Sequence, residues 1–352
     1  MTPKYIRLFF ILIAILLGSE AALGQVRNLD IYWVDVEGGA ATLIVSPSGE
    51  SLLVDSGWET DGRDAQRIFA VAQQAGLKKI NYFVISHYHG DHAGGIPALA
   101  KLIPIEKCFD RGDFVEPPNQ KWFDGYISVC GAKRTTVKVG DRIPLKGVQV
   151  DVVTANGKVI AKPIRGAGKP NPLCATAENK PPEGAENQFM ISTLFTFGKF
   201  TFLDLADLDW EKEMELACPI DKLGEVTLYQ AGRHGALDGA GAPGFLYAIR
   251  PQVVVVNNGP RKGLGGASPG PKKAQTAHYE RLANIPGVEG IWQGHLSLMD
   301  PEKDHNTAED MIANFEETKD CAGHWIRASV ARDGNFTVLN SRNGFSKNYM
   351  AR

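Results

Sequence analysis

The sequence predicts an α/β fold in which two β-sheets pack against each other and helices cover their outer faces. Short β-rich runs alternate with helical patterns along most of the chain. The chain has 352 residues, of which 43% are hydrophobic, so it can bury a substantial core. A stretch rich in Gly, Pro and Ala, residues 156–187, separates two halves with a similar order of strands and helices.

The N-terminus is predicted to be a cleaved secretory signal. Lys4 and Arg7 precede the apolar run FFILIAILLG, and the small residues Ala22 and Gly24 follow it. A charged region, a short apolar region and a cleavage-like site are typical of such signals, and the run is short for a membrane span. We therefore expect residues 1–24 to be removed, which leaves a periplasmic or secreted chain without an integral membrane segment; an uncleaved N-terminal anchor is the alternative.

In the first half of the mature chain, β-rich runs bounded by turn residues predict strands, and a period near 3.6 predicts helices. Strands are expected at LDIYWVDV, ATLIVSP, SLLVDSG, INYFVIS, TTVKVG and VQVDVVT, and helices at DAQRIFAVAQQAG and from about Gly94 through ALAKLI. Residues 156–187 are expected to form a loop insertion within one domain of residues 25–352.

The second half predicts strands that look antiparallel and are followed by helices. Strands are expected at FMISTLFTF, FTFLDLA, VTLYQAG, QVVVVNN, GIWQG, HWIRASVA and NFTVLN, and helices at WEKEMELA, FLYAIR, KKAQTAHYERLAN and AEDMIANFEE.

Charge and cysteine content limit the class of protein. The formal net charge of −2 predicts no extended nucleic-acid surface and no general attraction to anionic membranes, so an anionic substrate must be held locally. The five cysteines have no metal-binding spacing. Disulfides are permitted outside the cytosol, but their pairing cannot be deduced from the sequence.

The strongest functional signal is VISHYHGDHAGGI, in which His87, His89, Asp91 and His92 follow a buried strand within six positions. Side chains two residues apart in an extended segment point to the same side. His87 and His89 are therefore expected to serve one metal position, and Asp91 and His92 a neighbouring one. Imidazole and carboxylate ligands suit zinc first, and also manganese or iron. An ordinary polar turn is a poor description of four such residues.

The motif resembles the signature of the metallo-β-lactamase-fold hydrolases, and the resemblance covers most of the mature chain. YWVDV and LVDSG are similar to the opening hairpin of that fold. Within the superfamily, the sequence most resembles the hydrolase domain of DNA-uptake competence channel proteins, through EN before FMISTLFTF, ADL after FTFLDL, and RHGA after LYQAG. The resemblance implies a four-layer αββα sandwich of two mixed sheets with outer helices.

The resemblance also implies further ligands. Asp207 matches the aspartate that bridges two metals, and His234 matches the late histidine of the second site, so two divalent ions are expected. No histidine lies between His92 and Asp207, where many dinuclear relatives have one. The first metal is therefore expected to keep more water, to bind weakly, or to be filled only with substrate. Arg233 and Ala236 replace a histidine and a serine of the competence-type motif.

Other polar residues have two interpretations each. Asp55 can orient a metal-bound histidine or be a turn residue. His295 can be a ligand, a transition-state donor or a structural histidine. Arg233 and the basic loop from Gly259 to Pro271 can contact a phosphate or be solvated. Three other histidines are expected at the surface: His278, His305 and His324.

The predicted function is metal-assisted hydrolysis by a metal-bound hydroxide. Asp91 would bind metal and orient the hydroxide, and His295 or Arg233 would stabilise the developing charge. A phosphodiester or phosphorylated small molecule is weakly favoured as substrate, and a carboxylic ester, lactone or β-lactam is the alternative. A second alternative is a non-catalytic secreted protein with a structural metal, although such sites are usually closed by four protein ligands.

Overall fold

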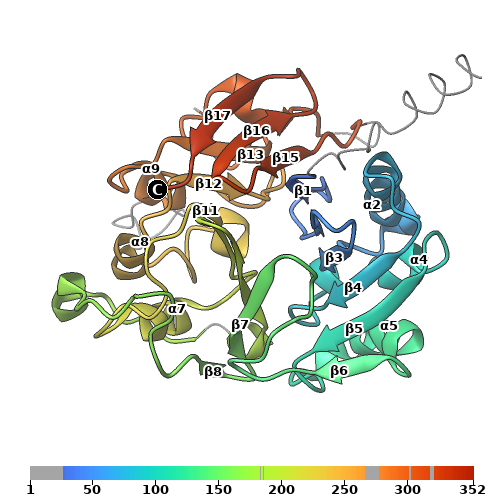
Figure 1. The fold of residues 1–352 in the computed structure, drawn as a ribbon, viewed down its shortest axis with the longest axis horizontal. Coiled ribbons are helices and arrows are strands. Elements are labelled where there is room, and N and C mark those ends of the chain that lie inside the picture. Colours follow the sequence, from blue (N-terminus) through green and yellow to red (C-terminus); the bar gives the residue numbers. More distant parts are fainter. Residues whose placement is uncertain (1–26, 183, 185, 266–276, 301–302, 318–320) are drawn as a thin grey trace, which may run out of the picture.

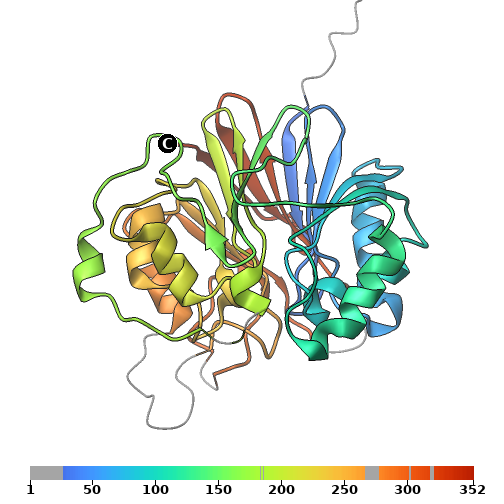
Figure 2. The same cartoon turned by 90° about the horizontal axis from the view of Figure 1, so that it is seen from below.

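The strand-forming runs assemble into two mixed β-sheets that pack face to face, with helices on both outer sides (Figure 1 and Figure 2). The computed structural model describes residues 27–182, 184, 186–265, 277–300, 303–317 and 321–352. This arrangement confirms the predicted fold class. The predicted signal, residues 1–24, lies outside the described residues.

The first sheet contains nine strands in the order β17-β16-β15-β1-β2-β3-β4-β5-β6. Its antiparallel part runs from β17 to β3, and β3 to β6 are parallel. The strands are β1 (Leu29–Trp33), β2 (Thr42–Val45), β3 (Ser51–Val54), β4 (Ile80–Val84), β5 (Ile105–Asp110), β6 (Arg134–Thr136), β15 (Ile326–Val330), β16 (Asn335–Asn340) and β17 (Ser346–Met350).

The second sheet contains eight strands in the order β14-β13-β12-β11-β10-β9-β7-β8. Strands β10 to β14 are parallel, and β9 joins them antiparallel. The strands are β7 (Gln149–Ala155), β8 (Lys158–Val159), β9 (Ser192–Phe197), β10 (Phe200–Asp204), β11 (Leu228–Gln230), β12 (Val253–Val256), β13 (Gly290–His295) and β14 (Ile312–Asn314).

Helices cover the outer face of each sheet (Figure 2). Apolar residues of α2 (Arg63–Gln74), α4 (Ile96–Leu99) and α5 (Gln120–Cys130) pack on the first sheet. Those of α7 (Trp210–Ala217), α8 (Pro243–Ile249) and α9 (His278–Ala283) pack on the second. Two short helices, α3 (Gly90–Ala93) and α6 (Glu186–Phe189), follow or precede strands at one end of the sandwich.

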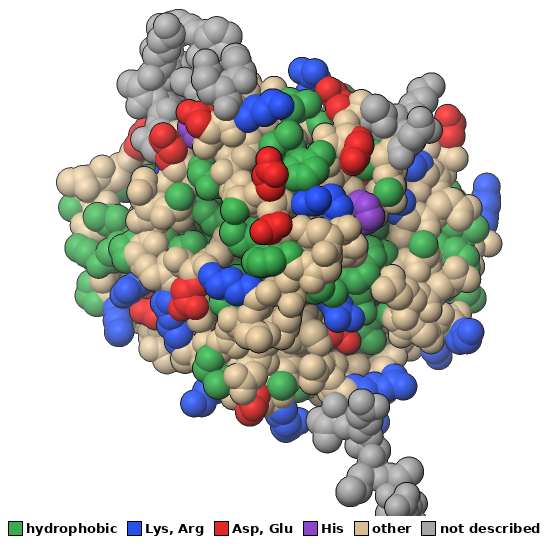
Figure 3. Space-filling model, turned by 90° about the horizontal axis from the view of Figure 1, so that it is seen from above, with side chains coloured by type: hydrophobic (Ala, Val, Ile, Leu, Met, Phe, Trp, Pro, Cys, Tyr) green, Lys and Arg blue, Asp and Glu red, His purple; other side chains and the backbone are tan. Residues whose placement is uncertain are grey.

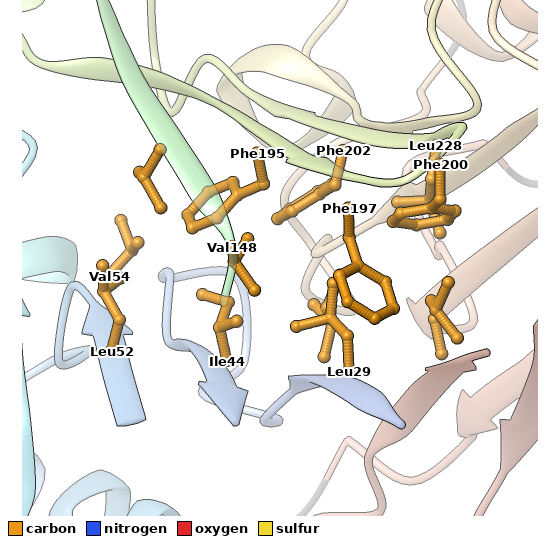
Figure 4. Close-up of a cluster of buried hydrophobic side chains, with 14 of the residues drawn as sticks. Leu29, Ile44, Leu52, Val54, Val148, Phe195, Phe197, Phe200, Phe202 and Leu228 are labelled. Atoms are coloured by element: carbon orange, nitrogen blue, oxygen red, sulfur yellow. The ribbon is translucent and has the colours of Figure 1, made fainter. Parts of the chain in front are cut away.

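The main core lies between the sheets. In Figure 4, phenylalanines of β9 and β10 face aliphatic side chains of the first sheet, among them Leu29, Ile44 and Leu52. Phe195 and Phe202 stack with ring centroids 5.4 Å apart. Burial on both faces explains why strands such as β12 are continuous apolar runs rather than alternating ones.

The structure corrects two expectations. AEDMIANFEE is not a helix: a short 3₁₀ turn, Glu309–Met311, leads into β14, which pairs with β13. Pairing at the sheet edge outweighs the helical pattern of this segment. Many strands that looked antiparallel are parallel, because helices connect them. Of the predicted helix KKAQTAHYERLAN, α9 forms the described part, and residues 272–276 lie outside the described residues.

The described part of residues 156–187 is mostly irregular chain around β8 and a 3₁₀ turn, Pro172–Thr176. A disulfide between Cys174 and Cys218 ties this segment to the end of α7, and a second disulfide joins Cys108 to Cys130. Cys321 is buried and unpaired. Among the described residues, no helix has both the length and the apolar character that a membrane span requires.

Candidate metal centre

The predicted ligands lie at one end of the sandwich because each follows the C-terminal end of a strand. His87 to His92 follow β4, Asp207 follows β10, and His234 follows β11 in a short 3₁₀ turn. The carboxyl ends of neighbouring parallel strands lie at the same edge of a sheet, where α/β proteins build their sites. Packing of the two sheets brings both edges together.

Four of the predicted ligands form a tight buried cluster: Asp91, His92, Asp207 and His234. The His234 Nε2 atom lies 3.3 Å from an Asp91 carboxylate oxygen and 3.2 Å from one of Asp207. The His92 Nε2 atom lies 3.5 Å from an oxygen of each carboxylate. The distant residues that the resemblance implied, Asp207 and His234, therefore meet the local motif.

This donor set fits a divalent cation. The Nε2 atoms of His92 and His234 are buried but have no hydrogen-bond partner. A buried polar atom without a partner is costly, and such atoms commonly mark an ion or water position. One donor atom from each of the four residues lies within 4.8 Å of the others. Two imidazoles and two carboxylates around one point are suitable ligands for zinc or a related metal.

His87 and His89 lie beside this cluster but are arranged differently. The His87 ring is fully buried, with its centroid 4.1 Å from that of His92. The His87 Nε2 and His89 Nδ1 atoms are 2.9 Å apart and hydrogen-bonded to each other. The other side of His89 is partly exposed and lies 3.7 Å from Glu116. The pair lies beside the four-residue cluster, and its role as a second metal position stays a prediction.

The charges in the cluster suit metal binding. Burial, together with the nearby rings of His92 and His89, holds the pKa of His87 well below its usual value, so the ring is neutral and able to coordinate. Burial alone would raise the pKa of the Asp207 carboxyl. The adjacent His234 and His92 reverse this and hold that pKa well below its usual range. Asp207 is therefore an ionised ligand.

Asp55 orients His92, which favours the first of its two interpretations. Its Oδ2 atom lies 2.7 Å from His92 Nδ1 and accepts a hydrogen bond from the Ser86 hydroxyl at 2.7 Å. Its Oδ1 atom accepts the Ser86 N–H at 2.8 Å. When the His92 ring is neutral, this contact would hold its proton on Nδ1 and leave the Nε2 lone pair for a cation.

Asp55→Asn is expected to weaken metal binding roughly 10- to 100-fold with little loss of fold. Asn keeps the acceptor for Ser86 N–H and tolerates the φ of 61° at this position. Its amide nitrogen cannot accept the proton on His92 Nδ1, so the ring loses its anchor. Competition with a chromogenic chelator measures the affinity. Unchanged metal affinity would show that Asp55 is only a turn residue.

A second buried network lies behind the cluster and joins the two sheets. Gln230 Oε1 accepts hydrogen bonds from Trp33 Nε1 at 2.8 Å and Thr42 Oγ1 at 2.9 Å. Its amide donates to Asp204 Oδ1 at 2.9 Å. Gln230 and Asp204 end the strands that lead to His234 and Asp207. The network therefore fixes the strand ends from which both distant ligands project.

Burial raises the pKa of the Asp204 carboxyl to about 7. Because the unfolded pKa is lower, ionisation disfavours the folded state, and stability falls as pH rises from about 4 to about 7. Asp204→Asn cannot ionise, yet it keeps an acceptor for Gln230. In chelated protein, we expect the unfolding free energy of the variant relative to wild type to increase between pH 4.5 and pH 8, by on the order of 3 kcal/mol at most. Urea unfolding at both pH values measures this, and a pH-independent difference would contradict it.

The structure also identifies positioning residues that the sequence did not reveal. Glu186 is fully buried and forms an ion pair with buried Arg111. Its carboxylate also accepts hydrogen bonds from the backbone N–H of Tyr88 and of Val115, each at 3.1 Å. The Tyr88 bond holds the loop between His87 and His89. The sequence offered the pair Glu186-Asn187 as a motif, but nothing in that motif indicates that Glu186 pairs with Arg111.

The predicted transition-state residues lie in other contacts. His295 Nε2 lies 2.7 Å from Asp35 in a separate buried group that includes Cys321 and is joined by Arg67. The Arg233 guanidinium pairs with Asp209 at 3.3 Å.

The three histidines expected at the surface have different environments. His278 is fully buried, which contradicts the expectation, because its Nδ1 bonds the carbonyl of Ala236 under α9. His305 and His324 are partly exposed.

The basic loop is partly described, since residues 266–276 lie outside the described residues. Lys262 forms an ion pair with Asp91, and its Nζ lies 5.4 Å from the Trp58 ring centroid. Arg261 points elsewhere and pairs with exposed Glu317. On the face shown in Figure 3, basic and acidic side chains are interspersed.

Comparison with known proteins gives one family and several distant relatives. Residues 34–148 match the model of the metallo-beta-lactamase superfamily. The chain is 23% identical over 228 residues to Recombination protein 2 of Haemophilus influenzae, covering 64% of this chain and 24% of that protein. It is 27% identical over 158 residues to a UPF0173 metal-dependent hydrolase of Polynucleobacter asymbioticus, covering 41% of this chain and 50% of the relative. The aligned regions thus span half or less of these relatives.

Among solved structures, the chain is similar to CmlA, a diiron beta-hydroxylase from Streptomyces venezuelae. The sequences are 13% identical, the match covers 75% of this chain and 48% of that chain, and the TM-score is 0.39. It is also similar to the metallo-beta-lactamase of Cronobacter sakazakii with a HARLDQ motif, at 17% identity, 51% and 60% coverage, and a TM-score of 0.32.

Proposed function

We propose that the chain is a metal-dependent hydrolase of the metallo-beta-lactamase superfamily, whose family model matches residues 34–148, and that it acts at the cluster of Asp91, His92, Asp207 and His234. One observation carries the proposal. Buried imidazole nitrogens without hydrogen-bond partners face two ionised carboxylates at one point. The relatives that are named metal-dependent hydrolases support the same enzyme class.

We propose two divalent ions, with zinc as the first expected metal and manganese or iron as alternatives. The four-residue cluster is the tight site, and His87 with His89 forms a weaker neighbouring site. When bound, such a cation lowers the pKa of water and polarises the bond under attack. The chain's own residues prepare this chemistry. Asp91 and Asp207 balance the charge, and Asp55 keeps the His92 lone pair directed at the site.

The substrate proposed is a phosphodiester or a phosphorylated small molecule. Similarity to Recombination protein 2 and the position of Lys262 beside Asp91 support this class. A carboxylic ester, lactone or β-lactam is the alternative within the same fold, because fold alone does not determine substrate. Export to the periplasm or medium is proposed from the signal-like N-terminus, and the two disulfides support it.

The test is removal and return of metal. Purified protein is treated with dipicolinate and then assayed on chromogenic phosphodiester, carboxylic ester and β-lactam substrates before and after zinc or manganese is added. We expect hydrolysis to fall at least a hundredfold on chelation and to return with the metal. The phosphodiester is expected to be the best of the three substrates. Activity that persists after complete metal removal would overturn the proposal.

A further inference from the structure

We propose that Lys262 supplies a fixed positive charge at this site in addition to the metal ion of the four-residue cluster. We propose further that its ammonium group keeps the His87–His89 position a weak metal site. The inference rests on the proposed function and extends it to how many metal ions the chain holds tightly. It assigns a specific task to a residue that the sequence placed only in a flexible basic loop.

The contact between Lys262 and the site is direct. Its Nζ forms an ion pair with the Oδ2 atom of Asp91, the same oxygen that lies 3.3 Å from His234 Nε2. The Asp91 side chain is 9% exposed and that of Lys262 is 37% exposed. The ammonium also lies over the Trp58 ring, a contact that favours a cation. The lysine therefore lies at the solvent side of the buried cluster.

The backbone holds Lys262 in this place. Residues 259–262 form a tight turn in which the Gly259 N–H bonds the Lys262 carbonyl at 2.9 Å. A Cβ on Gly38 would come within 3.2 Å of the Lys262 Cβ, and one on Gly263 would come within 1.9 Å of the His234 carbonyl oxygen. Such close approach leaves no room for side chains at either glycine. Lys262 is thus fixed between the loop before β2 and the loop that carries His234.

Charge balance explains the consequence for metal binding. A single divalent ion in the tight site and the Lys262 ammonium would together balance the carboxylates of Asp91, Asp207 and Asp55. A second divalent ion would leave the buried site with an unbalanced positive charge, which is unfavourable where water is excluded. The second position also has few ligands, because only His87 and His89 are proposed for it, they are hydrogen-bonded to each other, and the chain has no histidine between His92 and Asp207.

The same ammonium can act on a substrate. It lies beside Asp91 at the exposed edge of the cluster, so a substrate oxygen that gains negative charge there would meet a fixed cation. The chemical class that benefits is an ester whose hydrolysis concentrates charge on non-bridging oxygens, as in a phosphodiester.

The experiment titrates metal-free protein with zinc and manganese, using chelator competition and elemental analysis. The variants are Lys262→Met, which removes the charge, and Lys262→Arg, which retains it. Arg261→Met is the matched control, because Arg261 lies on the same turn but pairs with Glu317. Thermal unfolding shows whether each variant is folded. Hydrolysis of a chromogenic phosphodiester is measured on the same samples at one metal equivalent.

In wild type and in the Arg261→Met and Lys262→Arg variants, we expect one tight equivalent and a second at least tenfold weaker. In Lys262→Met, the second ion should bind at least tenfold more tightly, while kcat at one equivalent falls about a hundredfold. Two equally tight ions in wild type, or an unchanged second affinity in Lys262→Met, would overturn the inference. Failure of hydrolysis with normal metal titrations would instead contradict the proposed function.

Discussion

Asp207→Asn is expected to abolish tight metal binding and to lower hydrolytic activity at least a thousandfold. Asp207 lies 3.2 Å from His234 Nε2 and 3.5 Å from His92 Nε2, so it is, with Asp91, one of two carboxylates between imidazoles that come from different sheets. Burial would raise its pKa, but His234 and His92 hold that pKa well below its usual range. The carboxylate is therefore ionised at any working pH, and its charge is what an amide removes.

The isosteric change leaves packing almost unaltered, so the loss can be attributed to charge. Isothermal titration of metal-free protein with zinc measures the affinity, and the rate of phosphodiester cleavage measures activity. Asp113→Asn is the matched control, because the Asp113 side chain is 77% exposed and pairs with Arg134 at the surface. Asp207→Asn with wild-type metal affinity would show that the cluster is not the metal centre.

Whether the sequence alone predicts a metal ligand depends on how far along the chain that residue lies from the other ligands. His87, His89, Asp91 and His92 share one loop, so their spacing alone indicates a metal site. Asp207 and His234 lie more than a hundred residues away, and only the order of motifs in a known family linked them to that loop. Local pattern predicts chemistry when the donors are neighbours, and homology is needed when the fold brings them together.

Contacts between distant residues outside any motif could not be predicted. Lys262 in a Gly- and Pro-rich loop has the composition of a solvated segment, yet Gly38 on another loop and Gly263 next to Lys262 allow the close approach that brings Lys262 to Asp91. Similarly, the segment that becomes β14 has a helical pattern, and only the free edge of β13 selects a strand. Tertiary context overrides local propensity in both cases.

The second large effect concerns stability, and it should follow from Glu186→Ala. Glu186 and Arg111 are both buried, and removal of one partner leaves an uncompensated charge in the interior. Such a loss typically costs about 3–5 kcal/mol of unfolding free energy. It also removes the acceptor for the Tyr88 N–H, so the loop with His87 and His89 loses an anchor.

Urea unfolding of metal-free protein measures the cost, and the double variant Arg111→Met with Glu186→Leu separates its two sources. Apolar residues of similar volume remove both charges, so the double variant should recover much of the lost stability. It should not recover the anchor at Tyr88, because neither new side chain accepts a hydrogen bond. We therefore expect the affinity of the His87–His89 position for a second metal ion to stay below that of wild type in the double variant. Equal stability of the single and double variants would show that the buried charge is not the source of the loss.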